Sequence, residues 1–135
     1  MQINVFFLGT QISCRAHDQN ALCSTRAMLQ QQGLLQLPEI PEGCISNYHL
    51  CFVLLPTQAL RDELLEHLRS LSLRAVFHYV PLHNSPCGSQ FAPGLHLPQT
   101  EQLSVRLIRL PMYYELSAGD QQLVIDAVRN FCLSR

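Results

Sequence analysis

Hydrophobic residues recur at two different spacings in the middle of the chain, and each spacing predicts one kind of element. Residues 48–55 form a nearly unbroken apolar run that ends at a proline, which is typical of a strand covered on both faces. In residues 57–71, leucines recur at helical spacing behind a threonine that can cap the helix. In residues 73–80 the apolar period changes to two, which predicts a second strand ended by the next proline.

The charged side chains of the predicted helix take the face opposite its leucines. Because a helix of a globular protein usually turns its charged face to water, we expect these side chains to form a solvated surface. They are Arg61, Asp62, Glu63, Glu66 and Arg69.

The segments before this unit give weaker patterns. Residues 2–8 predict a short strand, and residues 20–32 predict a helix that stops at Gly33 in the left-handed conformation. Residues 34–43 contain two prolines, which predict an extended connector with few backbone donors.

After the second predicted strand, residues 84–98 are rich in proline and glycine. They predict a long loop without regular structure, and loops of this length often bind ligands. Residues 99–107 predict a short helix with Thr100 as its cap, and residues 107–110 predict a brief strand that the following proline stops.

The C-terminal segment predicts a last amphipathic helix. Ser117 and Asp120 are spaced as a capping box, with aspartate in place of the usual glutamate. The apolar face of this helix holds Val124, Ala127, Val128 and Phe131.

Together these elements predict a single α/β domain of the α+β kind, with a small, mostly antiparallel sheet and helices packed on it. A chain of 135 residues with 47% hydrophobic content is large enough to bury its own core. The formal net charge of −1 gives no basis for a nucleic-acid or membrane partner, so we expect neither.

The chain contains no lysine, because all nine of its basic residues are arginines. A reaction that needs a lysine Schiff base, such as the covalent anchoring of pyridoxal phosphate, cannot be carried out by these residues alone.

The chain has six cysteines, but their positions do not predict a disulfide framework. Cys23, Cys51 and Cys132 lie in apolar periodic segments, where a free cysteine behaves as a small hydrophobic residue. The N-terminus carries no basic residue ahead of its short apolar run and therefore predicts no secretory signal. We expect a reduced, cytoplasmic protein, and no segment has the length of a transmembrane helix.

Candidate chemistry gathers where the second predicted strand gives way to the long loop. His78, Tyr79 and His83 lie here, and polar groups at the end of a rigid element are well placed to meet a ligand. Cys87 next to His83 could form a nucleophile and its base, but nothing nearby supplies an oxyanion hole, so we predict a structural cysteine and no catalytic residue.

A metal site is a further interpretation of the same region. His78, His83, Cys87 and His96 are all types of zinc or copper ligand. Their spacing matches no standard zinc pattern, so we predict no bound metal, and metal binding stays a lesser alternative.

Four blocks between Gly33 and Phe131 carry a resemblance to a known family. They are residues 32–36, 75–83, 104–114 and 116–125. With these blocks in this order, the chain resembles the C-terminal small domain of the DegT-type sugar aminotransferases. These are pyridoxal-phosphate enzymes of the aspartate-aminotransferase fold that act on nucleotide-linked keto sugars. The resemblance is closest to the transaminases of TDP-4-oxo-6-deoxy-D-glucose.

The resemblance implies a role for each candidate residue. His78, Tyr79 and His83 would contact the sugar from the edge of the small domain. Arg106 and Arg109 would bind nucleotide phosphates or dock the domain, and docking is the favoured role. The family's lysine and its cofactor-binding loops belong to a large domain that has no counterpart here, so we expect no cofactor in the isolated chain.

The resemblance also implies a domain organisation. Residues 1–20 do not resemble the family, and residues 21–135 form one aminotransferase-like small domain that is truncated or detached. We expect it to contribute the sugar-facing wall of an active site and to be inactive alone. The alternative is a non-enzymatic module that binds a nucleotide sugar or acts as a regulatory pseudo-subunit. In either case the partners of the chain would be a second copy or the missing large domain. The apolar run at residues 5–8 would help to cover the surface that the missing domain leaves exposed.

Overall fold

The computed structural model describes residues 33–38, 42–44, 50–113 and 115–135. The described elements are β1 (Phe52–Leu54), α3 (Gln58–Ser70), β2 (Val76–Phe77), the 3-10 helix η1 (Leu82–Asn84), α4 (Gly88–Phe91), α5 (Pro98–Arg106), β3 (Leu107–Arg109) and α6 (Ala118–Leu133). The predicted fold class, a small antiparallel sheet with flanking helices, is confirmed.

The sheet has the strand order β1-β3-β2, and both strand pairs are antiparallel. Ile108 in the central strand lies opposite Val53 on one side and Phe77 on the other. Gln36 extends the sheet by an isolated bridge to Leu54 at the outer edge of β1.

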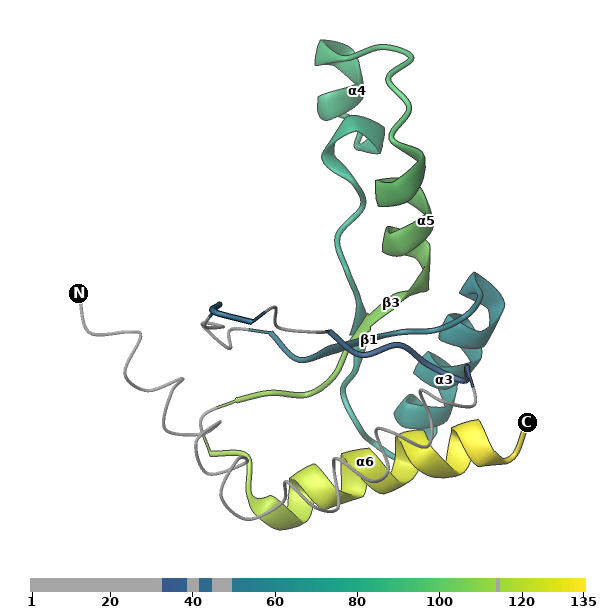
Figure 1. Ribbon diagram of the computed structural model, residues 1–135, viewed down its shortest axis with the longest axis vertical. Coiled ribbons are helices and arrows are strands. Elements are labelled where there is room, and N and C mark those ends of the chain that lie inside the picture. The colour runs from purple at the N-terminus through teal and green to yellow at the C-terminus, as the bar shows by residue number, and fades with distance from the viewer. Residues whose placement is uncertain (1–32, 39–41, 45–49, 114) are drawn as a thin grey trace, which may run out of the picture.

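The hydrophobic core lies between the sheet and the helices α3 and α6, which Figure 1 shows beside and below the strands. Val53 and Ile108 point into this core and are almost completely buried. The members of the core are Leu35, Val53, Leu55, Leu64, Leu68, Ile108, Ala127, Val128, Phe131 and Cys132. The expectation that this first strand is covered on both faces is wrong, because Phe52 and Leu54 on its other face are only half-buried.

Two of the three predicted helix caps, Thr57 and Ser117, are confirmed. The hydroxyl of Thr57 accepts the N–H of Leu60 at 3.2 Å at the start of α3, and the hydroxyl of Ser117 accepts the N–H of Asp120 at 3.1 Å at the start of α6. Each cap satisfies a backbone donor that has no partner within the helix. The predicted apolar face of α6 is buried.

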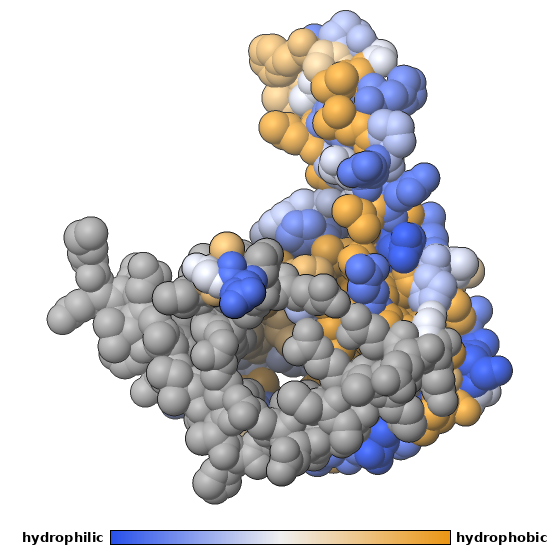
Figure 2. All heavy atoms as spheres, viewed as in Figure 1, coloured by the Kyte–Doolittle hydropathy of each residue, from blue (hydrophilic) through white to orange (hydrophobic). Residues whose placement is uncertain are grey.

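Between β2 and β3 the chain leaves the body of the molecule and returns, and residues 78–106 of this excursion are named the arm. Figure 1 shows the arm as η1, α4 and α5 rising away from the sheet. The helix α5 descends directly into β3. Figure 2 shows hydrophobic residues on the surface at the far end of the arm.

The second predicted strand, residues 73–80, is much shorter than expected. Only Val76 and Phe77 pair with β3, and both are exposed. The apolar alternation continues beyond them, but residues 78–80 enter the arm and have no neighbouring strand. A period of two predicts which side chains share a face, whereas a strand also needs a partner for its backbone.

The prediction of an unstructured loop at residues 84–98 is wrong, because α4 lies within it and η1 overlaps its start. A network around Ser85 folds this segment: its hydroxyl accepts the N–H of Gly88 at 3.0 Å and donates to the carbonyl of Leu82 at 2.7 Å. A serine side chain can replace backbone partners in a tight turn, and composition alone does not show where it does so.

The short predicted helix before β3 exists, but Thr100 does not cap it. The helix α5 begins at Pro98, with Leu97 at the N-cap position. Proline suits the first helical position because its φ is already helical and it has no N–H to satisfy. The Glu101 carboxylate, which lies within the helix, accepts the N–H of the N-cap residue Leu97 at 3.0 Å.

The expected strand at residues 2–8 and the helix at residues 20–32 lie outside the described residues. Gly33 has a φ of +67°, the left-handed conformation that a C-terminal helix stop requires. None of the described helices has the length and apolar character needed to cross a bilayer.

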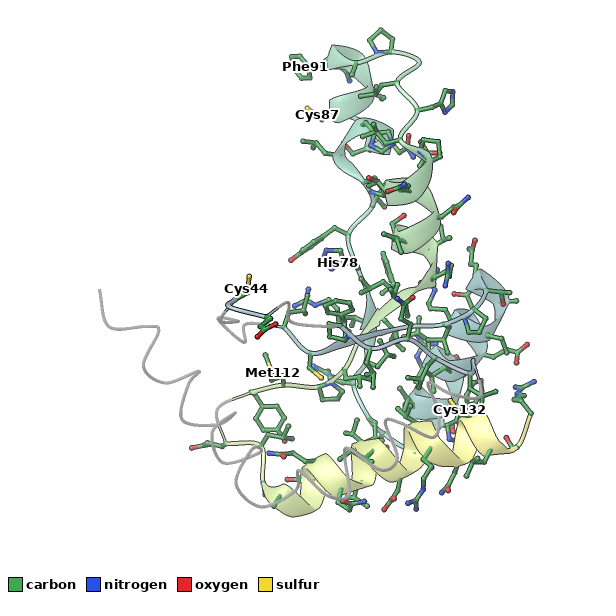
Figure 3. The ribbon with its side chains drawn as sticks, viewed as in Figure 1. Cys44, His78, Cys87, Phe91, Met112 and Cys132 are labelled. Atoms are coloured by element: carbon green, nitrogen blue, oxygen red, sulfur yellow. The ribbon has the colours of Figure 1, made fainter. Side chains whose placement is uncertain are left out.

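None of the four described cysteines forms a disulfide bond, namely Cys44, Cys51, Cys87 and Cys132. Cys132 packs in the core, and its burial raises the pKa of the thiol. Figure 3 shows Cys87 and Cys132 at opposite parts of the molecule, on the arm and on α6.

Candidate functional site

A cleft of about 290 Å³ lies at the base of the arm, between the arm and α3. This volume is at the small end of the range for ligand sites, roughly 300–1,000 Å³. The cleft is lined by Arg61, Phe77, His78, Tyr79, Val80, Pro81, Asn84, Glu101, Ser104 and Val105. The surface of the cleft is mostly apolar, although six of these ten residues have side chains that can form hydrogen bonds.

His78 and Tyr79 both line this cleft. Their ring centroids are 5.1 Å apart, and 73% of Tyr79 is exposed. A continuous strand would have placed the two side chains on opposite faces, but β2 ends one residue earlier, at Phe77. Nδ1 of His78 is buried and makes no hydrogen bond with the described residues. Figure 3 shows His78 at the base of the arm, above the sheet.

Arg61 forms part of the same cleft, although its charge predicted a solvated position. Only 8% of Arg61 is exposed, and its guanidinium lies 5.8 Å from the centre of the Phe77 ring. Its Nε is 3.1 Å from Oδ1 of Asp62, although the N–H does not point along a hydrogen bond. The signal was present in the sequence: Arg61 precedes Leu64 by three residues and so shares the buried face of α3.

His83 was expected to contact a sugar together with His78 and Tyr79, but it lies elsewhere. It is part of η1, with only 6% of its side chain exposed, and its Nε2 is 3.0 Å from Oε1 of Glu101. It lines a second, more apolar cleft of about 660 Å³ on the arm, together with Cys87 and Phe91. The structure thus brings two of the three predicted contacts together and separates the third from them.

Glu101 is the residue of this region that the sequence patterns missed. Its Oε1 accepts the Leu97 N–H and bonds His83, and Nδ1 of the exposed His96 lies 3.8 Å away. The hydrogen bond with His83 lowers the pKa of the Glu101 carboxyl below its ordinary value of 4.5, and the bond from Leu97 adds to this effect. Partial loss of water opposes it. An acidic side chain in the first turn of a predicted helix was the available signal.

The two arginines of the predicted phosphate or docking pair contact residues in or next to the sheet in this structure. Nε of Arg106 donates to the carbonyl of Leu55 at 2.7 Å. The guanidinium of Arg109 lies 5.8 Å from the centre of the Tyr79 ring, and its Nε is buried without a hydrogen bond to the described residues. Arg106 is thereby tied to the end of β1, and Arg109 supports Tyr79 from the sheet.

The four residues considered as metal ligands are not brought together. In the part of the chain that the structure describes, no group of three or more histidine, cysteine, aspartate or glutamate side chains could hold a metal ion. His83 and His96 both approach Glu101, whereas His78 lines the smaller cleft and Cys87 lines the larger one.

Comparison with known families gives one match over most of the chain. The model of the DegT/DnrJ/EryC1/StrS aminotransferase family matches residues 11–129, a range that includes the second half of residues 1–20. A curated relative is the dTDP-3-amino-3,4,6-trideoxy-alpha-D-glucose transaminase of Micromonospora megalomicea subsp. nigra. It is 34% identical over 108 residues, which cover 76% of this chain and 28% of the relative.

Solved structures of aminotransferases share the fold. DesV of S. venezuelae, in complex with a ketimine intermediate, is 31% identical with a TM-score of 0.66, covering 81% of this chain and 30% of DesV. TlmJ of Streptoalloteichus hindustanus is 27% identical with a TM-score of 0.65, covering 82% of this chain and 32% of TlmJ. The chain therefore spans less than a third of the length of these relatives.

Proposed function

We propose that this chain, which belongs to the DegT/DnrJ/EryC1/StrS aminotransferase family, acts as the small domain of a nucleotide-sugar aminotransferase. In this proposal the cleft at the base of the arm forms the sugar-facing wall of the active site. The observation that carries the proposal is the placement of His78 and Tyr79 side by side in that cleft.

The chemistry of the cleft suits a sugar. The exposed Tyr79 ring offers a flat apolar surface on which the C–H face of a sugar ring can pack, and its hydroxyl can bond a sugar hydroxyl. Asn84 and Ser104 add an amide and a hydroxyl at the edges of the same cleft. Such a site is mostly apolar, and a few placed polar groups give it orientation.

The residues of this chain would bind and orient the sugar and keep water from one side of it. His78 can hold a proton at either ring nitrogen, so in the cleft it could donate to or accept from a sugar hydroxyl. We place Arg106 and Arg109 in the docking and support of the cleft wall, because their contacts lie within the sheet region.

The family is dependent on pyridoxal phosphate, and this cofactor does not fit the present chain. The cofactor supplies an electron sink when a lysine anchors it as a Schiff base. No lysine occurs in these 135 residues. In the proposed function the cofactor and its anchor therefore come from residues outside this sequence.

The substrate class rests on a relative. The transaminase from Micromonospora megalomicea is named for a dTDP-linked amino sugar, and its similarity extends over most of this chain. We extend this class, a nucleoside-diphosphate sugar, to the present cleft.

The absence of lysine also favours a second candidate function, that of a non-enzymatic module. Such a module would bind a nucleotide sugar by itself or pair with a complete aminotransferase as a regulatory pseudo-subunit. Adding the purified chain to an active dTDP-sugar aminotransferase tests the pseudo-subunit. A pseudo-subunit would change the turnover rate of that enzyme, whereas a small domain that lacks its own large domain would leave the rate unchanged.

The proposed function is tested by titrating the chain with a dTDP-sugar. We expect saturable binding, and we expect Tyr79→Ala to weaken it about tenfold through the loss of stacking area on an aromatic ring. Calorimetry or a ligand-observed NMR experiment measures the change.

Tyr113→Ala is the matched control, because Tyr113 is also exposed but does not line the cleft. It should leave the affinity unchanged. Absence of saturation at millimolar ligand, or equal weakening by both variants, would contradict the proposal.

A further inference from the structure

The arm has no apolar core of its own. Of the side chains between β2 and β3, only His83 is buried, and the buried apolar side chains of the described residues all belong to the body. Hydrophobic contacts are the usual means of fixing one segment against another. Because the apolar side chains of the arm stay exposed or half-buried, its geometry depends strongly on its hydrogen bonds.

One carboxylate oxygen joins the two legs of the arm. Oε1 of Glu101, in the leg that returns to the sheet (residues 92–106), is 3.0 Å from Nε2 of His83 in the outgoing leg (residues 78–91). The same oxygen accepts the Leu97 N–H at 3.0 Å. Within the stretch 50–113, no other side-chain hydrogen bond connects the legs. The legs are also joined at the tip of the arm, where the N–H of Ala92 donates to the carbonyl of Gly88. Away from the tip, the bond between Glu101 and His83 is therefore the polar contact that sets their separation.

This contact lies between the two clefts of the arm. Glu101 lines the cleft with His78 and Tyr79, whereas His83 lines the larger apolar cleft. One wall of the smaller cleft belongs to the outgoing leg, and the opposite wall, with Ser104, belongs to α5. A change in the separation of the legs would move these two walls.

We infer that Glu101 is a positioning residue, whose carboxylate binds His83 and the Leu97 amide and thereby holds His78 and Tyr79 at a fixed distance from α5. We call the hydrogen bonds of Glu101 with His83 and Leu97 the link. The use of this arrangement in sugar binding rests on the proposed function, whereas the link itself does not. Glu101 need not touch the ligand, because it acts through the position of the cleft walls.

The link should depend on pH in a defined direction. The titratable and charged groups that face Glu101 are His83 from η1, His96 from the segment before α5, His78 across the cleft and Arg61 from α3. Because folding lowers the pKa of the Glu101 carboxyl, the link is complete above pH 4.5 and is lost as the pH falls through the lower pKa of the folded state.

The inference is tested on the whole chain by amide hydrogen exchange at Leu97 in Glu101→Ala and Glu101→Gln. Loss of the charged acceptor in the alanine variant should speed exchange about tenfold. The NMR signals of His78 and Tyr79 should shift in the same variant. Glutamine keeps an oxygen that can accept the Leu97 N–H, so Glu101→Gln should restore protection and abolish its loss in acid.

Two controls keep the result interpretable. Glu66→Ala removes an exposed carboxylate whose one ion pair among the described residues is with Arg69 on α3. It should leave Leu97 unchanged. The amide of Leu110, which donates to Cys51 in the body at 3.0 Å, should stay protected in every variant if the fold is intact.

Unchanged exchange at Leu97 in Glu101→Ala, or acid-induced loss of protection that persists in Glu101→Gln, would overturn the inference. No nucleotide sugar is used, so the result does not depend on the proposed function. A chain that shows the expected exchange but binds no dTDP-sugar would contradict the proposed function alone.

Discussion

At the scale of single residues, Gly88 shows how closely the outgoing leg of the arm is packed. A Cβ atom at this position would lie 1.8 Å from the carbonyl oxygen of Leu82 and 3.0 Å from the hydroxyl of Ser85. The first of these is a backbone atom, which cannot move aside as a flexible side chain can. Glycine is therefore required by this close approach, not by an unusual φ.

Gly88→Ala should disrupt the turn between η1 and α4. We expect exchange of the Ser89 and Ala92 amides to become about ten to a hundred times faster, since overpacking costs about 1–3 kcal/mol. These amides donate to Ser85 and Gly88 in the present structure. Hydrogen exchange followed by NMR measures the effect.

Gly119→Ala is the control for this change. Its added Cβ would meet only the hydroxyl of Ser117, at an ordinary contact distance of 3.7 Å. Because alanine favours a helix more than glycine does, stability should stay the same or rise by up to about 1 kcal/mol. Equal effects of the two substitutions would show that close packing at Gly88 is not the cause.

At the scale of elements, the two long helices and the arm obtain their stability differently. The helices α3 and α6 have hydroxyl caps and apolar faces that meet in the core. The short helix α5 has no buried residue and begins without a hydroxyl cap. Local opening should therefore begin in the arm, because regions with few buried apolar contacts have low local stability.

Ser117→Ala removes the cap of α6 and should lower the free energy of unfolding by about 1 kcal/mol. The N–H of Asp120 would lose its side-chain acceptor. The effect should be measurable because α6 contributes several buried residues to the core. Urea denaturation followed by circular dichroism measures the change in midpoint.

Ser70→Ala is the matched change at the end of α3, where the exposed hydroxyl donates to the carbonyl of His67. An exposed site of this kind should change stability by less than about 0.5 kcal/mol. A Ser117 variant as stable as the Ser70 variant would contradict the capping role.

At the scale of the whole molecule, residues 78–100 of the arm present an apolar surface without formal charge. Residues 75–100 contain no aspartate, glutamate, lysine or arginine. Leu82 and Phe91 are exposed by 78% and 84%, and Figure 3 shows Phe91 at the far end of the arm. Depletion of charge and exposure of aromatic residues are typical of the centre of a protein interface.

We expect the purified chain to self-associate through the arm, with Phe91 of one copy packing on the larger apolar cleft of another. Phe91→Ser should shift the population towards monomer, which sedimentation velocity measures. Leu133→Ser changes an exposed apolar residue at the end of α6 and should have no such effect. A monomeric wild-type chain, or an equal response to both substitutions, would contradict this expectation.

The sequence by itself determined the features that depend on near neighbours in the chain. The caps at Thr57 and Ser117, the buried face of α6 and the order of β1, α3, β2, α5, β3 and α6 follow from spacing and local hydrogen bonding, which act over a few residues. The blocks of the family resemblance likewise lie in the sequence, and the match over residues 11–129 confirms them.

Only the tertiary structure decided what depends on residues far apart in the chain. The second strand stops at Phe77 because β3 ceases to pair with it there, and this brings His78 and Tyr79 to one cleft. His83 lies outside the cleft of His78 and Tyr79, where it forms a hydrogen bond with Glu101, 18 positions further along the chain. Periodicity assigns a side chain to a face, but the partner on that face is set by how distant segments pack. That packing brings Arg61 to the ring of Phe77 and His83 to Glu101.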